Sequence, residues 1–210
     1  MDNLDQKIAK NLLQSKAIKL EPATPFTWAS GWKSPIYCDN RRTLSFPEIR
    51  TLIKNGFATL IQEKYADVDV IAGVATGAIA QGALVADALG KPFIYVRSSA
   101  KSHGMENLIE GKIEPGKKVV VIEDLVSTGG SSLKAVNALR NADYKVLGMC
   151  AIFSYGFDLA SKNFEDNHCE LHTLTQYNTV VQLAAETGYI NHEEITLLKD
   201  WRKQPDSWGQ

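Results

Sequence analysis

The chain has 210 residues, 44% of them hydrophobic, and a formal net charge of -1 at pH 7. This length and composition predict a soluble globular protein with one well-filled core and room for a small appended lobe. The near balance of 23 basic and 24 acidic residues excludes an overall field for nucleic acid or an anionic membrane, so anions must be bound by local clusters. No stretch reaches the roughly eighteen apolar residues that span a bilayer.

The first part of the chain is predicted to hold two helices separated by short strands and turns. Residues 3–16 carry leucine and isoleucine at helical spacing. The following stretch is rich in proline, serine, glycine and aromatic residues. From Pro47 the apolar positions again follow one helical face. We assign residues 1–66 to an N-terminal hood with its helices. Three scattered cysteines are typical of reduced thiols in a cytoplasmic protein.

From residue 67 strands and helices alternate. Strand patterns occur in DVDVIAGV, KPFIYVRSS, KKVVVI and YKVLGMCAIFSY, and helix patterns in AIAQGALVADAL and SSLKAVNALRNA. Apolar runs such as VVVI predict strands buried on both faces, as in a parallel sheet between helices. We therefore predict an α/β fold, a doubly wound and mainly parallel sheet flanked by helices over residues 67–210. Loops after Ile71, Tyr95 and Ile122 should meet at the carboxyl edge of the sheet.

The stretch VVVIEDLVSTGG places two carboxylates, Glu123 and Asp124, at the end of a buried strand. Unpaired carboxylates there are costly, so a ligand or a partner should contact them. The glycine-containing loop that follows enters a helix, whose first N–H groups are suited to phosphate. Acceptors for hydroxyls beside donors for phosphate fit a ribose 5-phosphate. The alternative is a solvated strand end followed by an ordinary N-cap.

The whole pattern resembles the phosphoribosyl pyrophosphate (PRPP) motif of type I phosphoribosyltransferases. The resemblance implies the fold of that family, with the acidic pair on the ribose hydroxyls and the next loop on the 5-phosphate. It assigns PRPP binding in this motif to Glu123, Asp124, Leu125, Val126, Ser127, Thr128, Gly129, Gly130 and Ser131.

Two further loops fit the same resemblance. Small residues after the first core strand would let backbone N–H groups approach the pyrophosphate, although small residues there are also common for packing alone. The polar segment RSSAKSHGMENLIEG is longer than most connections and is interpreted as a lid, the alternative being a solvated charged loop. The pyrophosphate loop is Ala75, Thr76 and Gly77, and the cations for the leaving pyrophosphate are Arg97, Lys101 and His103.

The acceptor is suggested by PFTWASGWKSPIYCDNRR and by KSHGMENLIEG, which resemble the hood and the catalytic loop of orotate phosphoribosyltransferases. The resemblance implies the glycosyltransferase reaction of PRPP and orotate in cytoplasmic pyrimidine (UMP) biosynthesis. It implies Mg²⁺ held mainly through PRPP, and a homodimer in which Lys101 reaches the partner's site. The residues implied as catalytic are Lys101, His103 and Asp124, and those near orotate are Ser127 and Lys33.

One departure concerns the orotate carboxylate, because some family members carry an arginine just past the strand AIFSY. This chain reads Phe153, Ser154, Tyr155 and Gly156 there. Three other functions remain open: transfer to a purine or another base, PRPP sensing without turnover, and a subunit whose partner supplies the chemistry. The histidines and cysteine of NHCELH lack metal-ligand spacing and are interpreted as a surface cluster at a strand edge.

Overall fold

The computed structural model describes residues 3–28, 30–99 and 108–209. Its centre is a six-stranded sheet in the order β10-β9-β8-β5-β6-β7. Neighbouring strands are parallel, except that β7 runs antiparallel to β6. The predicted mainly parallel α/β sheet is therefore confirmed. The strands are β5 (Val70–Val74), β6 (Phe93–Val96), β7 (Ile109–Glu110), β8 (Lys118–Val126), β9 (Lys145–Ser154) and β10 (Leu171–Gln176).

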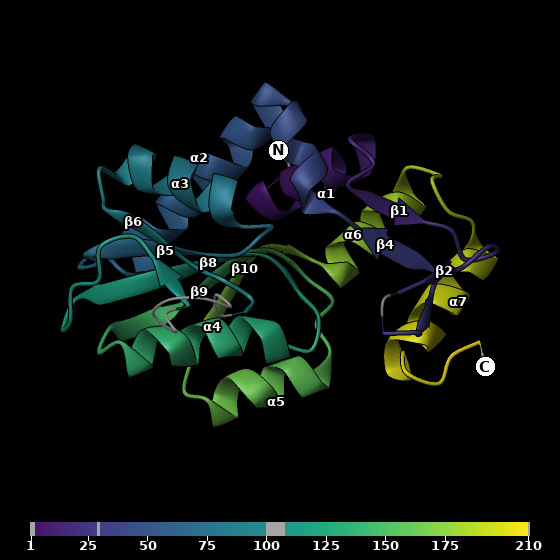
Figure 1. Cartoon of the computed structure of the whole chain (residues 1–210). Coiled ribbons are helices and arrows are strands. Elements are labelled where there is room, and N and C mark those ends of the chain that lie inside the picture. The colour runs from purple at the N-terminus through teal and green to yellow at the C-terminus, as the bar shows by residue number, and fades with distance from the viewer. Residues whose placement is uncertain (1–2, 29, 100–107, 210) are drawn as a thin grey trace.

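Helices cover both faces of this sheet (Figure 1). Side chains of β8 alternate between two buried clusters, Val120 and Ile122 in one and Val119 and Val121 in the other. The VVVI run is thus buried on both faces, as its composition predicts. One face carries α1 (Leu4–Gln14), α2 (Pro47–Lys64) and α3 (Ile79–Leu89), the other α4 (Gly130–Asn141) and α5 (Asp158–Asp166), and α6 (Tyr177–Glu186) and α7 (His192–Lys203) lie toward one end.

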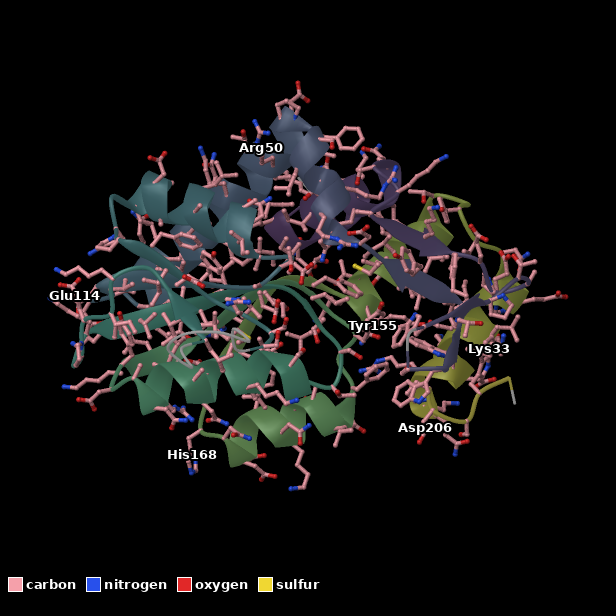
Figure 2. All side chains as sticks on the ribbon, in the orientation of Figure 1. Lys33, Arg50, Glu114, Tyr155, His168 and Asp206 are labelled. Carbon is pink, nitrogen blue, oxygen red and sulfur yellow. The ribbon has the colours of Figure 1, made fainter. Side chains whose placement is uncertain are left out.

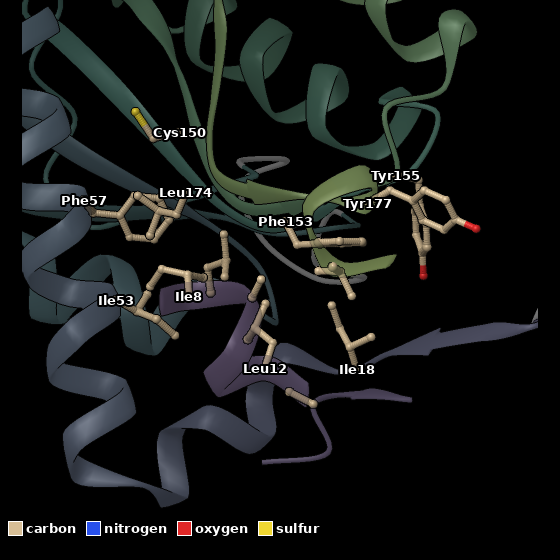
Figure 3. Close-up of a cluster of buried hydrophobic side chains, with 14 of the residues drawn as sticks. Ile8, Leu12, Ile18, Ile53, Phe57, Cys150, Phe153, Tyr155, Leu174 and Tyr177 are labelled. Atoms are coloured by element: carbon tan, nitrogen blue, oxygen red, sulfur yellow. The ribbon is translucent and has the colours of Figure 1, made fainter. Parts of the chain in front are cut away.

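The N-terminal helices belong to the main core. Ile8 and Leu12 of α1 and Phe57 of α2 are completely buried, and Figure 3 shows Phe57 beside Leu174 of β10. Because apolar residues on α1 recur at helical spacing, one side of the helix is buried against the sheet while the other stays polar. None of the described helices combines the length and apolar character needed to cross a bilayer.

At the carboxyl end of the sheet, two small antiparallel pairs and a short 3-10 helix form the hood, residues 18–45. The last helix, α7, lies beside this hood (Figure 1). Trp201 of α7 donates from Nε1 to the carbonyl of Lys33 at 3.1 Å, and its ring centroid is 5.7 Å from that of Trp28. The hood elements are β1 (Ile18–Leu20), β2 (Phe26–Thr27), β3 (Lys33–Ser34), β4 (Ile36–Cys38) and η1 (Asn40–Ser45).

The predicted strand ends come too early: β5 continues past Ile71 to Val74, and β6 past Tyr95 to Val96. The central strand was expected to end at Ile122, but β8 continues to Val126. Its pairing with β5 stops at Ile122, while pairing with β9 continues opposite Ala151 and Phe153. A single neighbour is enough to keep a strand extended, so the acidic pair lies inside the strand and not in the loop.

Candidate active site

The two neighbouring carboxylates of β8 point in different directions. Glu123 is 4% exposed, and its Oε2 accepts from the Ser132 hydroxyl at 2.8 Å. Its Oε1 accepts from the backbone N–H of Asp124 at 3.0 Å. The carboxylate of Asp124 lies against the loop after β5, so closely that a Cβ on Gly77 would overlap it. Strand alternation therefore turns Glu123 toward α4 and Asp124 toward the predicted pyrophosphate loop.

Burial changes the charge state of this acidic pair. Loss of hydration, and secondly the negative charge of Asp124, raise the pKa of Glu123 to about 8. Burial also raises the pKa of Asp124, and the nearby cation Arg41 partly opposes that rise. Near neutral pH the two carboxyl groups therefore carry less than two full negative charges.

We expect Glu123→Gln to stabilise the ligand-free protein, increasingly so as pH rises. Glutamine keeps both contacts, because its oxygen can accept from the Asp124 N–H and its amide can donate to Ser132. The pKa of Glu123 is higher in the folded state, so wild-type stability falls between its ordinary value of 4.5 and about 8. The variant should gain about 2 kcal/mol in unfolding free energy between about pH 5.5 and about pH 8.5. Urea unfolding at both pH values measures this gain, and a pH-independent difference would contradict it.

The loop after β8 has backbone N–H groups without acceptors among the described residues. Gly129 has φ +83°, and a Cβ there would approach the Phe164 ring of α5 to 2.8 Å. Asn163 of α5 donates to the carbonyl of Thr128 at 2.8 Å. Within the described residues, the N–H groups of residues 127–131 have no acceptor, and a Cβ on Gly130 would meet only open space. These donors lie at the positive end of α4, which is favourable for phosphate.

The loop after β5 offers a second set of donors. The N–H of Ala75 is bonded to the carbonyl of Val96 at 2.8 Å, which ties the loop to β6. The N–H groups of Thr76 and Gly77 have no acceptor in the part of the chain that is described. Because Asp124 lies directly against Gly77, its carboxylate and two loops with unbonded N–H groups meet at one edge of the sheet.

Comparison with known proteins agrees with this geometry. The model of the phosphoribosyl transferase domain family matches residues 47–185. Orotate phosphoribosyltransferase of Porphyromonas gingivalis is 61% identical over the full length of both chains. This chain belongs to the orotate phosphoribosyltransferase family. It shares the type I phosphoribosyltransferase fold.

Solved structures of the family have the same architecture. Orotate phosphoribosyltransferase from Aeropyrum pernix superposes with a TM-score of 0.76 at 27% identity, covering 88% of this chain and 99% of that one. The Mycobacterium tuberculosis orotate phosphoribosyltransferase in complex with PRPP superposes with a TM-score of 0.65 at 22% identity. That match covers 87% of this chain and 100% of the other, and at this identity it shows the fold alone.

The predicted cations of this phosphoribosyltransferase are not all at the acidic pair. Arg97 follows β6 directly and pairs with Glu110 of β7 at 3.5 Å. The ammonium of Lys33 donates to the Thr27 hydroxyl at 2.8 Å within the hood, and Figure 2 shows Lys33 near the C-terminal part of the chain. Lys101 and His103 lie outside the described residues. The roles of Lys33, Ser127 and the lid cations stay predictions.

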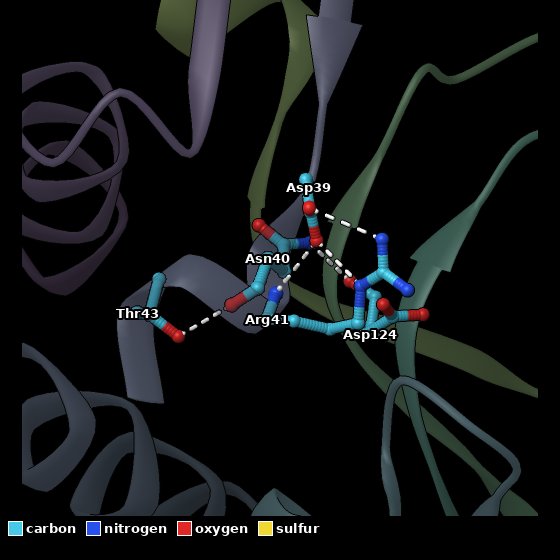
Figure 4. A network of polar contacts seen from close by, with 5 residues as sticks. All are labelled: Asp39, Asn40, Arg41, Thr43 and Asp124. Carbon is cyan, nitrogen blue, oxygen red and sulfur yellow. Dashed lines mark hydrogen bonds and ion pairs between the residues drawn. The ribbon is translucent and has the colours of Figure 1, made fainter. Parts of the chain in front are cut away.

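Sequence reasoning did not single out three residues that contact the acidic pair. Ser132 binds Glu123, as described above. Asn40 of the hood donates from Nδ2 to the carbonyl of Asp124 at 2.5 Å (Figure 4). Arg41 pairs with Asp39 at 2.7 Å while its charge also acts on Asp124. In the sequence, the signal that could have pointed to Asn40 and Arg41 was the DNRR stretch of the hood pattern. In the structure Asn40 is 2% exposed, and a polar residue so buried rarely lacks a partner.

The described residues contain no group of three or more His, Cys, Asp or Glu side chains placed to hold a metal ion. In the NHCELH stretch, His168 occupies a turn with φ +48°, whereas His172 pairs with Glu170 at 3.0 Å. For Mg²⁺, the fitting feature is the Asp124 carboxylate beside the two anion-binding loops. A hard cation that keeps waters and phosphate oxygens needs only one or two such carboxylates.

Proposed function

We propose that this chain transfers the 5-phosphoribosyl group from PRPP to orotate, giving orotidine 5-monophosphate and pyrophosphate. The observation that carries the proposal is the meeting of Asp124 with free N–H groups on both sides. Residues 127–131 lie on one side, and Thr76 and Gly77 lie on the other. A full-length relative, 61% identical, has this activity in its name.

Each part of PRPP then has its own group of residues. The 5-phosphate binds the N–H donors at the start of α4, and Asp124 accepts from a ribose hydroxyl. The pyrophosphate binds the N–H groups of Thr76 and Gly77. Glu123 accepts from the Ser132 hydroxyl and from the backbone N–H of Asp124, so its main role is to hold the strand end and α4 in place. These fixed contacts orient the anomeric carbon toward the acceptor nitrogen.

The chemical step separates charge, since the bond to pyrophosphate breaks ahead of the bond to orotate. Positive charge grows on the ribose and negative charge on the leaving group. A modest enzymatic acceleration needs about 8 kcal/mol, whereas an exposed ion pair supplies about 0–1 kcal/mol. Fixed dipoles and cations in a site closed to water can supply the difference. Asp124, near the ribose, lowers the cost of its positive charge. Asp124 is the described carboxylate that would hold a Mg²⁺ ion, which would supply positive charge to the pyrophosphate oxygens.

The lid, the assembly and the location are part of the same proposal. Lys101 and His103 bind the leaving pyrophosphate, and Lys101 does so across a homodimer interface. The enzyme works in the cytoplasm in pyrimidine biosynthesis.

We expect Lys101→Ala to lower kcat by about tenfold or more while PRPP affinity changes little, because its charge acts mainly as the leaving group becomes negative. Steady-state kinetics and PRPP calorimetry measure the two effects. Mixing this variant with an inactive Asp124→Asn variant should restore part of the activity if the lid acts in the partner's site. A loss confined to PRPP affinity would contradict the role of Lys101.

The proposed function is tested by the absorbance of orotate after mixing the purified chain with Mg²⁺ and PRPP. Orotate should be consumed, and pyrophosphate should form in equal amount. Uracil, adenine, hypoxanthine and xanthine should be used at least about a hundredfold less efficiently. If the chain used a purine base in preference to orotate, the acceptor would be that purine and not orotate. No turnover by the chain alone would favour a regulator or a subunit that needs a partner.

A further inference from the structure

A cavity of about 980 Å³ opens at the end of β9, between the core and the C-terminal helix. Its wall includes Thr128 of the phosphate loop and Trp32 of the hood. The cavity therefore adjoins the proposed PRPP site on the hood side. Figure 2 shows the labelled Tyr155 between the sheet and the part of the chain that holds Lys33 and Asp206.

Arg202 of α7 lies in the wall of this cavity, next to the end of β9. Its Nε donates to the carbonyl of Tyr155 at 3.2 Å and its Nη2 to that of Gly156 at 2.5 Å. Its guanidinium carbon is 5.9 Å from the centroid of the Tyr177 ring. A guanidinium has five N–H donors, and these bonds use two of them. The side chain is half-buried and is one of the residues that line the cavity, so it has N–H donors beyond those two bonds.

The rest of the wall suits a flat ring that carries an anion. Trp32, Phe157 and Tyr177 supply aromatic surface. The helices α5 and α6 both begin at this wall, and no described side chain caps the first N–H groups of either. Three acidic side chains also line the cavity, one of them, Asp200, paired with Lys203 at 3.0 Å. Only Arg202 among the lining cations is fixed to the end of β9.

Orotate differs from uracil by one carboxylate, so its enzyme needs a cation for that group. The end of β9, residues 153–156, contains none. Three described cations near the acidic pair or in the hood have other partners: Arg41 with Asp39, Arg97 with Glu110 and Lys33 with Thr27. Arginine binds carboxylates in a planar, two-pronged way that lysine cannot reproduce.

We propose that Arg202 binds the carboxylate of orotate, so that the C-terminal helix supplies the acceptor specificity. The inference rests on the proposed function and adds to it the residue that selects the acceptor. Orotate lies in the cavity mouth between Trp32 and Phe157, with its ring nitrogen toward the ribose held by Asp124. The PRPP contacts do not involve Arg202.

The test compares Arg202→Gln and Arg202→Lys with Arg140→Gln. Arg140 of α4 is a matched control, because it too donates to two backbone carbonyls, those of Asn167 and His168. In Arg202→Gln the KM for orotate should rise at least about tenfold, with the KM for PRPP within about threefold of wild type. Arg202→Lys should be intermediate, and Arg140→Gln should change neither KM.

Binding of orotidine 5-monophosphate and of UMP isolates the carboxylate, since the two nucleotides differ by that group alone. Calorimetry should show that wild type prefers the former at least about tenfold and that Arg202→Gln loses the preference. An unchanged preference, or equal losses for orotate and PRPP, would overturn the proposal. If Arg202→Gln does not fold, phenylglyoxal labelling of wild type decides. Orotidine 5-monophosphate should protect Arg202 and UMP should not, and equal protection would overturn the proposal.

Wild-type turnover separates this inference from the proposed function. If the wild-type chain does not use orotate, the proposed function itself is wrong. A wild-type chain that uses orotate, with Arg202 variants that keep its KM, removes only the role of Arg202.

Discussion

Replacing Gly77 with alanine should reduce kcat/KM for PRPP by at least about a hundredfold. The added methyl group would overlap the carboxylate of Asp124, which is half-buried at the end of β8. Either the loop after β5 or Asp124 must shift, and both are proposed to hold PRPP. A shift of about 1 Å in such contacts is enough for a loss of this size.

Gly56→Ala is the control for this substitution. Gly56 lies in α2, where a Cβ would meet the side chains of Leu4 and Leu174 at 3.3–3.4 Å. That contact asks only for a small movement of flexible side chains, and alanine is the better helix former. Gly56→Ala should therefore keep both KM values. The PRPP affinity of the two variants is measured by calorimetry. Normal PRPP affinity in Gly77→Ala would mean that Asp124 does not contact PRPP.

Asp124→Asn should weaken PRPP binding by about a hundredfold while the melting temperature stays equal or rises. Asparagine has the same shape, but it replaces a charged acceptor by an amide and can no longer balance positive charge on the ribose. The pKa of Asp124 is raised by burial, so removing its charge also removes a desolvation cost from the folded protein. Stability and binding should therefore change in opposite directions, as is common for functional charges.

Asp166→Asn on α5 is the control, because its ion pair with Lys162 is exposed and contributes little. The PRPP affinity of this variant, measured by calorimetry, and its melting temperature should equal those of wild type. Asp124 would have no part in the site if its asparagine variant bound PRPP as wild type does.

The core of the fold could be predicted because its signals are local. The VVVI run, the helical spacing before Leu12 and the loop ending in Gly129 each specify an element within a few residues, and the parallel sheet follows from them. The phosphate loop could be proposed from the sequence for the same reason. Its donors are backbone groups whose position depends on the strand, the turn and the helix that follow one another in the chain.

The parts that sequence reasoning missed depend on contacts between distant segments. Asn40 reaches Asp124 across the hood, and Arg202 reaches the end of β9 from the last helix. No periodicity indicates such pairs. The opposite directions of Glu123 and Asp124 were missed for another reason, because the strand was expected to end before them. Once β8 is known to continue to Val126, alternation follows directly.

The contact between Trp28 and Trp201 joins the hood to α7. During synthesis the sheet has all its strands once Gln176 has left the ribosome, but the hood still lacks its support until α7 emerges. A nascent or C-terminally shortened chain should therefore bind the sugar phosphate although it does not yet select the acceptor base. Order of translation and order of site assembly coincide, with acceptor choice as the final step.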